Sequence, residues 1–91
     1  MKQKKSKITE KTATAEFFLK RRQQMAIPQM KLANALGLES CQFISNIERS
    51  LALAPPQRFK ELARVFNCHT DDLIKAHMRD LEVRVRRQVE G

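Results

Sequence analysis

The apolar residues of this chain recur at the three- and four-residue spacing of α-helices in five successive segments. Each segment opens on a residue that suits a helix N-terminus, because Ser and Thr can cap the first turn and Pro has no N–H to leave unpaired there. The predicted starts are Thr14, Pro28, Ser40, Pro56 and Thr70. Stops are predicted near Met25 and at Gly37 and Asn67, since Gly and Asn readily adopt the left-handed conformation that ends helices.

The helix predicted after Ser40 has two contrasting faces. Ile44 and Ile47 fall on one side at helical spacing and are expected to pack inward. The opposite side carries hydrogen-bonding side chains, namely Gln42, Ser45, Asn46 and Arg49. A turn over residues 37–39 joins this helix to the one before it. Two short helices joined by a tight turn, the second with a polar outer face, meet the geometric requirement for reading a DNA major groove.

The segment after residue 75 is compatible with two structures. As a helix, it places Ile74, Met78, Leu81 and Val85 four, three and four residues apart, the spacing of a coiled-coil seam. As a strand, apolar and charged residues alternate over residues 81–89. The helix is favoured, because neither Gly nor Pro separates this segment from the helix before it. Both forms leave apolar side chains that need a partner, so we assign residues 76–91 as an oligomerisation segment.

The net charge of the chain indicates what kind of partner it binds. The 91 residues carry a formal net charge of +8, and a small protein with such an excess usually binds a polyanion. Residues 1–13 hold five Lys and one Glu, a net charge of +4, and show no apolar period. We therefore expect a disordered basic arm over residues 1–13 and a single helical domain over residues 14–75. Nucleic acid is the first candidate for the polyanion.

Composition and motifs argue against several other classes of protein. Two Cys are too few for a disulfide framework, and no apolar run has the length of a signal peptide or membrane span, so a cytoplasmic protein without membrane contact is expected. Cys68, His69 and His77 lack the paired spacing of structural zinc sites, and no metal or other cofactor is predicted. Asp71 and Asp72 suit a helix N-terminus better than catalysis. Without a nucleophile and base arrangement, no enzyme is predicted.

Residues 27–50, IPQMKLANALGLESCQFISNIERS, resemble the Cro and phage-repressor-like helix-turn-helix family, also called the xenobiotic-response-element type. The pattern LAxxLGL followed by IER carries the resemblance. It continues through FKELARVFNCHTDDLI and so covers roughly residues 16–75. The resemblance implies an all-α fold in which five helices form a helix-turn-helix domain that binds double-stranded DNA.

The resemblance also implies roles for individual residues. Gln29 corresponds to a residue that binds a backbone phosphate from the start of the second helix. The reading residues of the family correspond to Ser40, Cys41, Gln42, Phe43, Ser45 and Asn46. Gln42 is the best candidate for a base reader, because its amide can pair bidentately with adenine. Asn46 can contact base or phosphate, and Phe43 can either touch a thymine methyl or fold back onto the turn. Arg49, on the same outer face, completes the candidate DNA-binding set.

Other positions concern structure rather than readout. Arg22 and Glu48 match an ion pair that is common in the family. Ala26 and Pro28 stand where the family favours Gly and Ser, and Ser50 replaces the usual Gly after IER. The turn before the third helix is also one residue longer. These departures affect loop geometry, whereas the apolar spacing is kept.

We expect a sequence-specific regulator of transcription, a repressor that acts as a homodimer and is associated with the nucleoid. Two copies are expected because one short helix contacts too few base pairs to select one site among many. One alternative is an antitoxin, whose C-terminal segment grips a protein partner. The other is a nucleoid protein that binds DNA without sequence preference.

Overall fold

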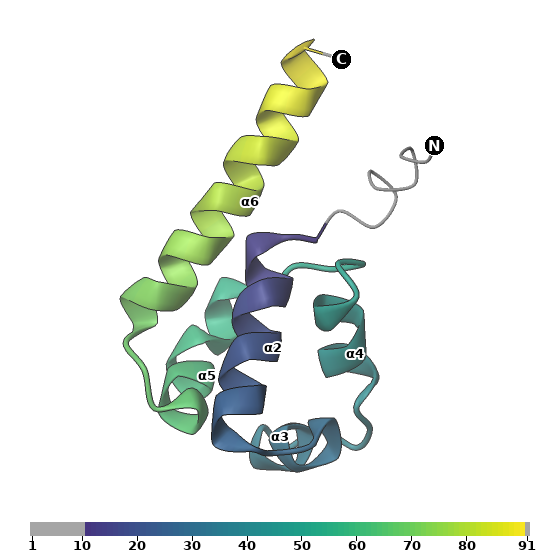
Figure 1. The fold of residues 1–91 in the computed structure, drawn as a ribbon, viewed down its shortest axis with the longest axis vertical. Helices are drawn as coiled ribbons and strands as arrows, with labels where there is room; N and C mark the ends of the chain where they lie inside the picture. Colours follow the sequence, from purple (N-terminus) through teal and green to yellow (C-terminus); the bar gives the residue numbers. More distant parts are fainter. Residues whose placement is uncertain (1–10, 91) are drawn as a thin grey trace.

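The structure, a computed structural model, describes residues 11–90 and folds them into five α-helices and a short 3₁₀ helix, with no strand in that range (Figure 1). In chain order these are α2 (Ala13–Met25), α3 (Gln29–Ala35), α4 (Gln42–Glu48), the 3₁₀ helix η1 (Pro56–Arg58), α5 (Phe59–Phe66) and α6 (Thr70–Glu90). The predicted all-α class with five helices is confirmed. No helix within residues 11–90 is both long and apolar enough to cross a membrane.

Helix α2 packs against α4, α5 and α6, while α3 packs against α4 (Figure 1). The largest fully buried side chains come from all five helices: Phe18, Leu32, Ile44, Ile47, Leu62, Phe66 and Leu73. The rings of Phe18 and Phe66 meet edge to face with 5.1 Å between centroids, an arrangement that the ring quadrupole favours. Burial of one such side chain stabilises the fold by about 1.5–3 kcal/mol. The helical periodicity of the sequence thus produces one shared core.

The first three N–H groups of α2 are all accepted by side-chain oxygens. Thr12 Oγ1 accepts the N–H of Ala15 at 2.9 Å. Asp80, on α6, accepts the N–H of Ala13 at 2.7 Å and that of Thr14 at 3.0 Å. The prediction that Thr14 caps this helix is therefore wrong. Thr12 is the cap, and Thr14 is buried inside the first turn with its hydroxyl donating to Asp80.

The predicted basic arm falls mainly on residues 1–10, which lie outside the described residues. Its last residues belong to the helical domain. Thr12 caps α2, and its own N–H donates to Ser50 Oγ at 3.0 Å. Because this bond joins the start of α2 to the end of α4, the domain extends to Thr12 instead of beginning at residue 14.

Four helices end with one residue in the left-handed conformation. These residues are Ala26 (φ 55°), Gly37 (φ 75°), Ser50 (φ 64°) and Asn67 (φ 55°). At each end the following N–H donates to the carbonyl five residues back, as in a Schellman motif: Ile27 to Arg22, Leu38 to Ala33, Leu51 to Asn46 and Cys68 to Ala63. The stops predicted at Gly37 and Asn67 are confirmed. Ala26 and Ser50 adopt the same conformation although they carry a Cβ.

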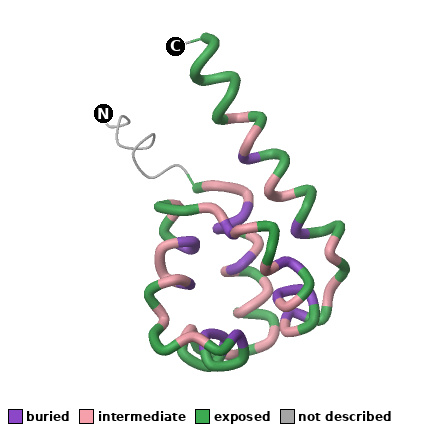
Figure 2. The backbone as a smooth tube through the Cα atoms, turned by 180° about the vertical axis from the view of Figure 1, so that it is seen from behind, coloured by how far each residue is buried: buried purple, intermediate pink, exposed green. Residues whose placement is uncertain are grey.

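Residues 76–90 continue α6 without a break, so the strand alternative over residues 81–89 is wrong. Leu73 and Asp80 are the buried residues of α6 and face the rest of the domain. Beyond Asp80 the helix extends away from the other helices, and most of its residues are exposed (Figure 1, Figure 2). The helical form has a physical advantage here, because a helix pairs its backbone groups internally whereas a lone strand leaves both edges unpaired.

Candidate nucleic-acid interface

Helices α3 and α4 are joined by a turn over residues 36–41. The N–H of Gly37 donates to the Asn34 carbonyl at 3.0 Å, and that of Leu38 donates to the Ala33 carbonyl at 2.9 Å. Leu38 then packs against the core. The turn is therefore held by two backbone hydrogen bonds and one apolar anchor, which set the direction in which the chain enters α4.

The start of α4 differs from the prediction by one residue. Cys41, not Ser40, occupies the N-cap position, and it makes no side-chain capping bond. Ser40 Oγ accepts the Gln42 N–H at 3.3 Å, which is a long contact. Ser40 as the cap is thus wrong, and both Ser40 and Cys41 precede the helix.

The outer side of α4 presents amide groups. Gln42 and Arg49 are exposed, and Ser45 and Asn46 are half-buried. Gln42 Nε2 donates to Asn46 Oδ1, one turn further along the helix, at 2.9 Å. This bond leaves the carbonyl oxygen and second N–H of Gln42, and the amino group of Asn46, able to bond a ligand. The two predicted readers therefore form a coupled pair that offers donors and an acceptor together.

Two predicted contact residues lie against the domain. Cys41 and Phe43 are half-buried and pack against the core. The guanidinium carbon of Arg58 lies 5.6 Å from the Phe43 ring centroid, a cation–π distance. Arg58 also donates to the Leu36 carbonyl at 3.2 Å and to Glu61 at 2.7 Å. Phe43 thus adopts the folded-back arrangement of its two alternatives, and Arg58 connects the end of α3 to α4.

An ion pair joins α2 to the last turn of α4. Arg22 Nε donates to Glu48 Oε2 at 2.7 Å, and Arg22 Nη2 donates to Glu48 Oε1 at 3.0 Å, so the contact is bidentate. Glu48 is 4% exposed, and its hydrogen bonding raises the pKa of Arg22 above the ordinary value. Arg22 Nη1 also donates to the Ile27 carbonyl at 2.9 Å. The pair that the resemblance implies is present, and it also holds the loop before α3.

Gln29 joins this ion pair. Its Nε2 donates to Glu48 Oε1 at 2.9 Å, so the Glu48 carboxylate accepts from three donors. Gln29 is half-buried at the first position of α3. Its amide oxygen and second N–H stay able to bond a ligand, and the phosphate contact remains a prediction. The additional role, which the sequence did not reveal, is to fix the start of α3 against the end of α4.

The predicted seam residues of α6 point away from the domain. Ile74 is 43% exposed, Met78 and Val85 are each 56% exposed, and Leu81 is half-buried. Val89, one turn beyond Val85, is 79% exposed. We call these five residues the α6 stripe. Contiguous apolar surface of this kind often marks a contact with another protein, which makes the stripe a candidate interface.

Arg58 and Asp80 are structural residues whose contacts the sequence pattern does not reveal. Asp80 lies 66 and 67 residues from the backbone groups it accepts, and Arg58 lies 22 residues from Leu36. No local period reports contacts at such separations. The only available signal was the seven-residue spacing of Asp80 from Leu73, which places both on one side of the helix.

The residues considered for metal binding are not clustered. Among residues 11–90, no group of three or more His, Cys, Asp or Glu side chains is arranged to hold a metal ion. The His77 ring packs edge-on against Phe59, with 5.6 Å between centroids, and His69 is exposed. Cys41 and Cys68 are free, and burial raises the pKa of the Cys68 thiol.

Comparisons of the chain with protein-family models, with curated proteins and with solved structures found no match. Function is therefore inferred from the residues and contacts described above.

Proposed function

We propose that this protein is a sequence-specific DNA-binding regulator of transcription, a cytoplasmic repressor that binds its operator as a homodimer. The observation that carries the proposal is the two-sided character of α4. Ile44 and Ile47 are buried against the core. Gln42 and Arg49 are exposed on the other side, where Gln42 is paired with Asn46. A helix of this kind can enter a major groove and offer amide groups to base edges.

The contacts around α4 support this role, because base readout needs a helix held in one position. Glu48, in the last turn, is bound by Arg22 and Gln29. Near the first turn, Arg58 lies over Phe43 and bonds the end of α3. A recognition helix held at both ends loses little further freedom on binding, so more of the interaction energy is left for affinity.

The net charge of +8 supports DNA as the ligand. Lys and Arg side chains that meet phosphates release condensed counterions, so the affinity should fall steeply as the salt concentration rises. The proposal includes no enzymatic activity and no cofactor.

The α6 stripe supports binding as a dimer. One short helix reads too few base pairs to select a single site, whereas two copies related by a two-fold axis read two half-sites. Burial of the stripe between two copies would also remove exposed apolar surface from water.

Selection of duplexes from a random pool tests the proposal. We expect an enriched sequence with two half-sites related by two-fold symmetry, bound at least about 1,000-fold more tightly than a scrambled duplex. The matched control is the double variant Gln42→Ala, Asn46→Ala, which keeps the net charge. It should lose the preference and keep the salt-dependent binding. A pool without a preferred sequence contradicts the regulator and favours the nonspecific nucleoid protein.

The exposed α6 stripe also favours a second candidate, an antitoxin whose α6 binds a toxin protein. Co-expression with the product of the adjacent reading frame separates the two functions. An antitoxin forms a stable complex with that product and suppresses its toxicity, whereas a repressor homodimer does neither.

A further inference from the structure

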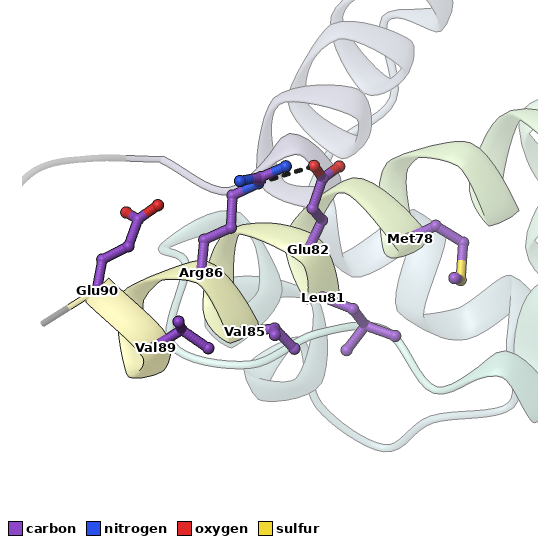
Figure 3. Close-up of a pocket in the computed structure, with 7 residues that line it drawn as sticks. All are labelled: Met78, Leu81, Glu82, Val85, Arg86, Val89 and Glu90. Carbon is purple, nitrogen blue, oxygen red and sulfur yellow. Dashed lines mark hydrogen bonds and ion pairs between the residues drawn. The ribbon is translucent and has the colours of Figure 1, made fainter.

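Four exposed charged residues that border the α6 stripe on one side alternate in sign, and Arg79 lies slightly further round the helix from the stripe. Asp71, Lys75, Glu82 and Arg86 are exposed and carry negative, positive, negative and positive charge in that order. At about 100° of rotation per residue, all four fall within about 60° of one another around the helix axis, next to the stripe. Figure 3 shows the arrangement over the last turns, where Glu82 and Arg86 project on one side and Met78, Leu81, Val85 and Val89 on the other.

The order of charges along one α6 is complementary to the order along a second α6 that runs in the opposite direction. If a second α6 runs in the opposite direction, the sequence of signs that it presents is positive, negative, positive, negative. Each charge then meets its opposite, because Asp71 lies at the level of Arg86 and Lys75 lies at the level of Glu82 on the other helix.

We propose that α6 pairs with α6 of a second copy of this chain in antiparallel orientation, with the two-fold axis passing near Arg79. The inference rests on the homodimer of the proposed function and adds its orientation and contacts. Along the stripe, Ile74 packs against Val85 of the second copy, and Met78 packs against Leu81. Because the two-fold axis repeats every contact, the two apolar contacts and the two ion pairs each form twice. The dimer therefore contains four apolar contacts and four ion pairs.

The rest of the fold leaves room for this pairing. Leu73 and Asp80 face the domain on another side of α6, so packing among residues 11–90 leaves the stripe exposed except at Leu81, which is half-buried. The half of α6 beyond Asp80 extends away from the other helices (Figure 1). In an antiparallel pair, this half lies along the first half of the other α6, and the two domains lie at opposite ends.

In a parallel pair of α6 helices, these four charged residues do not meet opposite charges on the other helix. In parallel coiled coils, each flank contacts the opposite flank of the other helix, five residues further along. That geometry sets His77 against Glu82, Arg84 against Val89 and Thr70 against Lys75. Asp71 and Arg86 gain no partner from the other helix in it. Within residues 11–90, Asp71 and Lys75 form no ion pair, and the pair between Glu82 and Arg86 is exposed, so these charges can bond a second chain.

Charge reversals at Lys75 and Glu82 test the orientation. Lys75→Glu and Glu82→Lys each place like charges together twice in the antiparallel dimer, and each should raise the dimer dissociation constant about tenfold. The double variant Lys75→Glu, Glu82→Lys restores both attractive pairs and should return the constant to within about twofold of the parent. An equimolar mixture of the two single variants should form a heterodimer for the same reason. Sedimentation over a concentration series measures all four.

Two controls separate pairing from other effects. Lys20→Glu and Glu39→Lys change the net charge equally at exposed positions outside α6 and should leave the dissociation constant unchanged. Lys75 and Glu82 lie seven residues apart, about 10 Å along the helix, so they do not compensate each other within one chain. Circular dichroism checks that each variant keeps its helix content, since Glu82→Lys also removes the Arg86 contact.

The possible results are distinct. The first result to consider is an unmutated protein that forms a dimer and a double variant whose dissociation constant is as high as those of the two single variants. In that case the antiparallel orientation is wrong, but the homodimer is not contradicted. If the parent is a monomer at every concentration, with and without its selected duplex, both the orientation and the homodimer are wrong. Selective binding of a duplex is measured separately and does not depend on either result.

Discussion

The carboxylate of Asp80 accepts a hydrogen bond of 2.6 Å from the hydroxyl of Thr14, which joins the middle of α6 to the first turn of α2. The same carboxylate accepts two backbone N–H groups of that turn. A buried carboxylate at a helix N-terminus also interacts favourably with the helix dipole. Asp80 therefore acts as a second cap for α2, supplied by an element at the other end of the chain.

Replacement of Asp80 by Ala should lower the free energy of unfolding by about 1–3 kcal/mol, because three donors lose their acceptor in a largely buried place. Chemical denaturation at a fixed chain concentration measures the change. Glu90→Ala is the matched control, since it removes an exposed carboxylate from the same helix and should change stability by less than about 0.5 kcal/mol. Equal effects of the two substitutions would show that the Asp80 contacts add nothing.

Replacement of Glu48 by Ala should lower the free energy of unfolding by about 1–3 kcal/mol, because Arg22 and Gln29 lose their shared acceptor. DNA binding should weaken as well, since α4 is then less firmly held, while the preferred bases stay the same. Thermal melting and binding to the selected duplex measure the two effects. Glu39→Ala, in the exposed turn, is the control. An unchanged melting midpoint would refute the role of the pair.

Ala26 and Ser50 provide a test of the left-handed helix ends. Ala26→Gly should raise stability by up to about 1 kcal/mol, because Gly adopts a positive φ without the steric cost of a Cβ. Ser50→Gly should gain less or lose stability, because Ser50 Oγ also accepts the Thr12 N–H. Denaturation midpoints of both variants decide this. A larger gain at Ser50 than at Ala26 would contradict the assigned bond.

Gln42→Ala should weaken binding to the selected duplex by about 1–3 kcal/mol and relax selection at one base position in each half-site. Because Gln42 and Asn46 are bonded to each other, the effects of Gln42→Ala and Asn46→Ala should not be additive in the double variant. Binding to duplexes with single substitutions measures both. Uniform weakening for all sequences would instead assign Gln42 to a phosphate.

The Cys68 thiol provides a pH test. Burial raises its pKa in the folded protein, so the folded state keeps the proton over a pH range in which the unfolded chain has lost it. Because the unfolded chain releases a proton that the folded protein retains, raising the pH stabilises the unfolded chain more than the folded one. The free energy of unfolding should therefore decline from about pH 8.5 upward. Cys68→Ala should remove that part of the decline. Melting midpoints at pH 7 and pH 10, under reducing conditions, compare the two proteins.

Much of the fold can be predicted from short stretches of the sequence. The order of the helices, their apolar faces and the stops at Gly37 and Asn67 follow from spacing and from the conformations that each residue type can adopt. The Arg22–Glu48 ion pair could be predicted from the resemblance to the helix-turn-helix family, because both residues occupy positions that match the pair common in that family. The polar outer side of α4 was accessible for the same local reason, because 3.6 residues per turn place its amides opposite Ile44 and Ile47.

Other features were decided only by the tertiary structure. Thr12 rather than Thr14 caps α2, because Asp80 competes for the first N–H groups and draws the Thr14 hydroxyl inward. Phe43 folds back, because Arg58 and the core offer it contacts that no local pattern contains. Hydrogen bonds and ring contacts depend on distance in space and not on distance along the chain. The helices could therefore be predicted from the sequence, whereas the contacts that lock them together became visible only once the chain was folded.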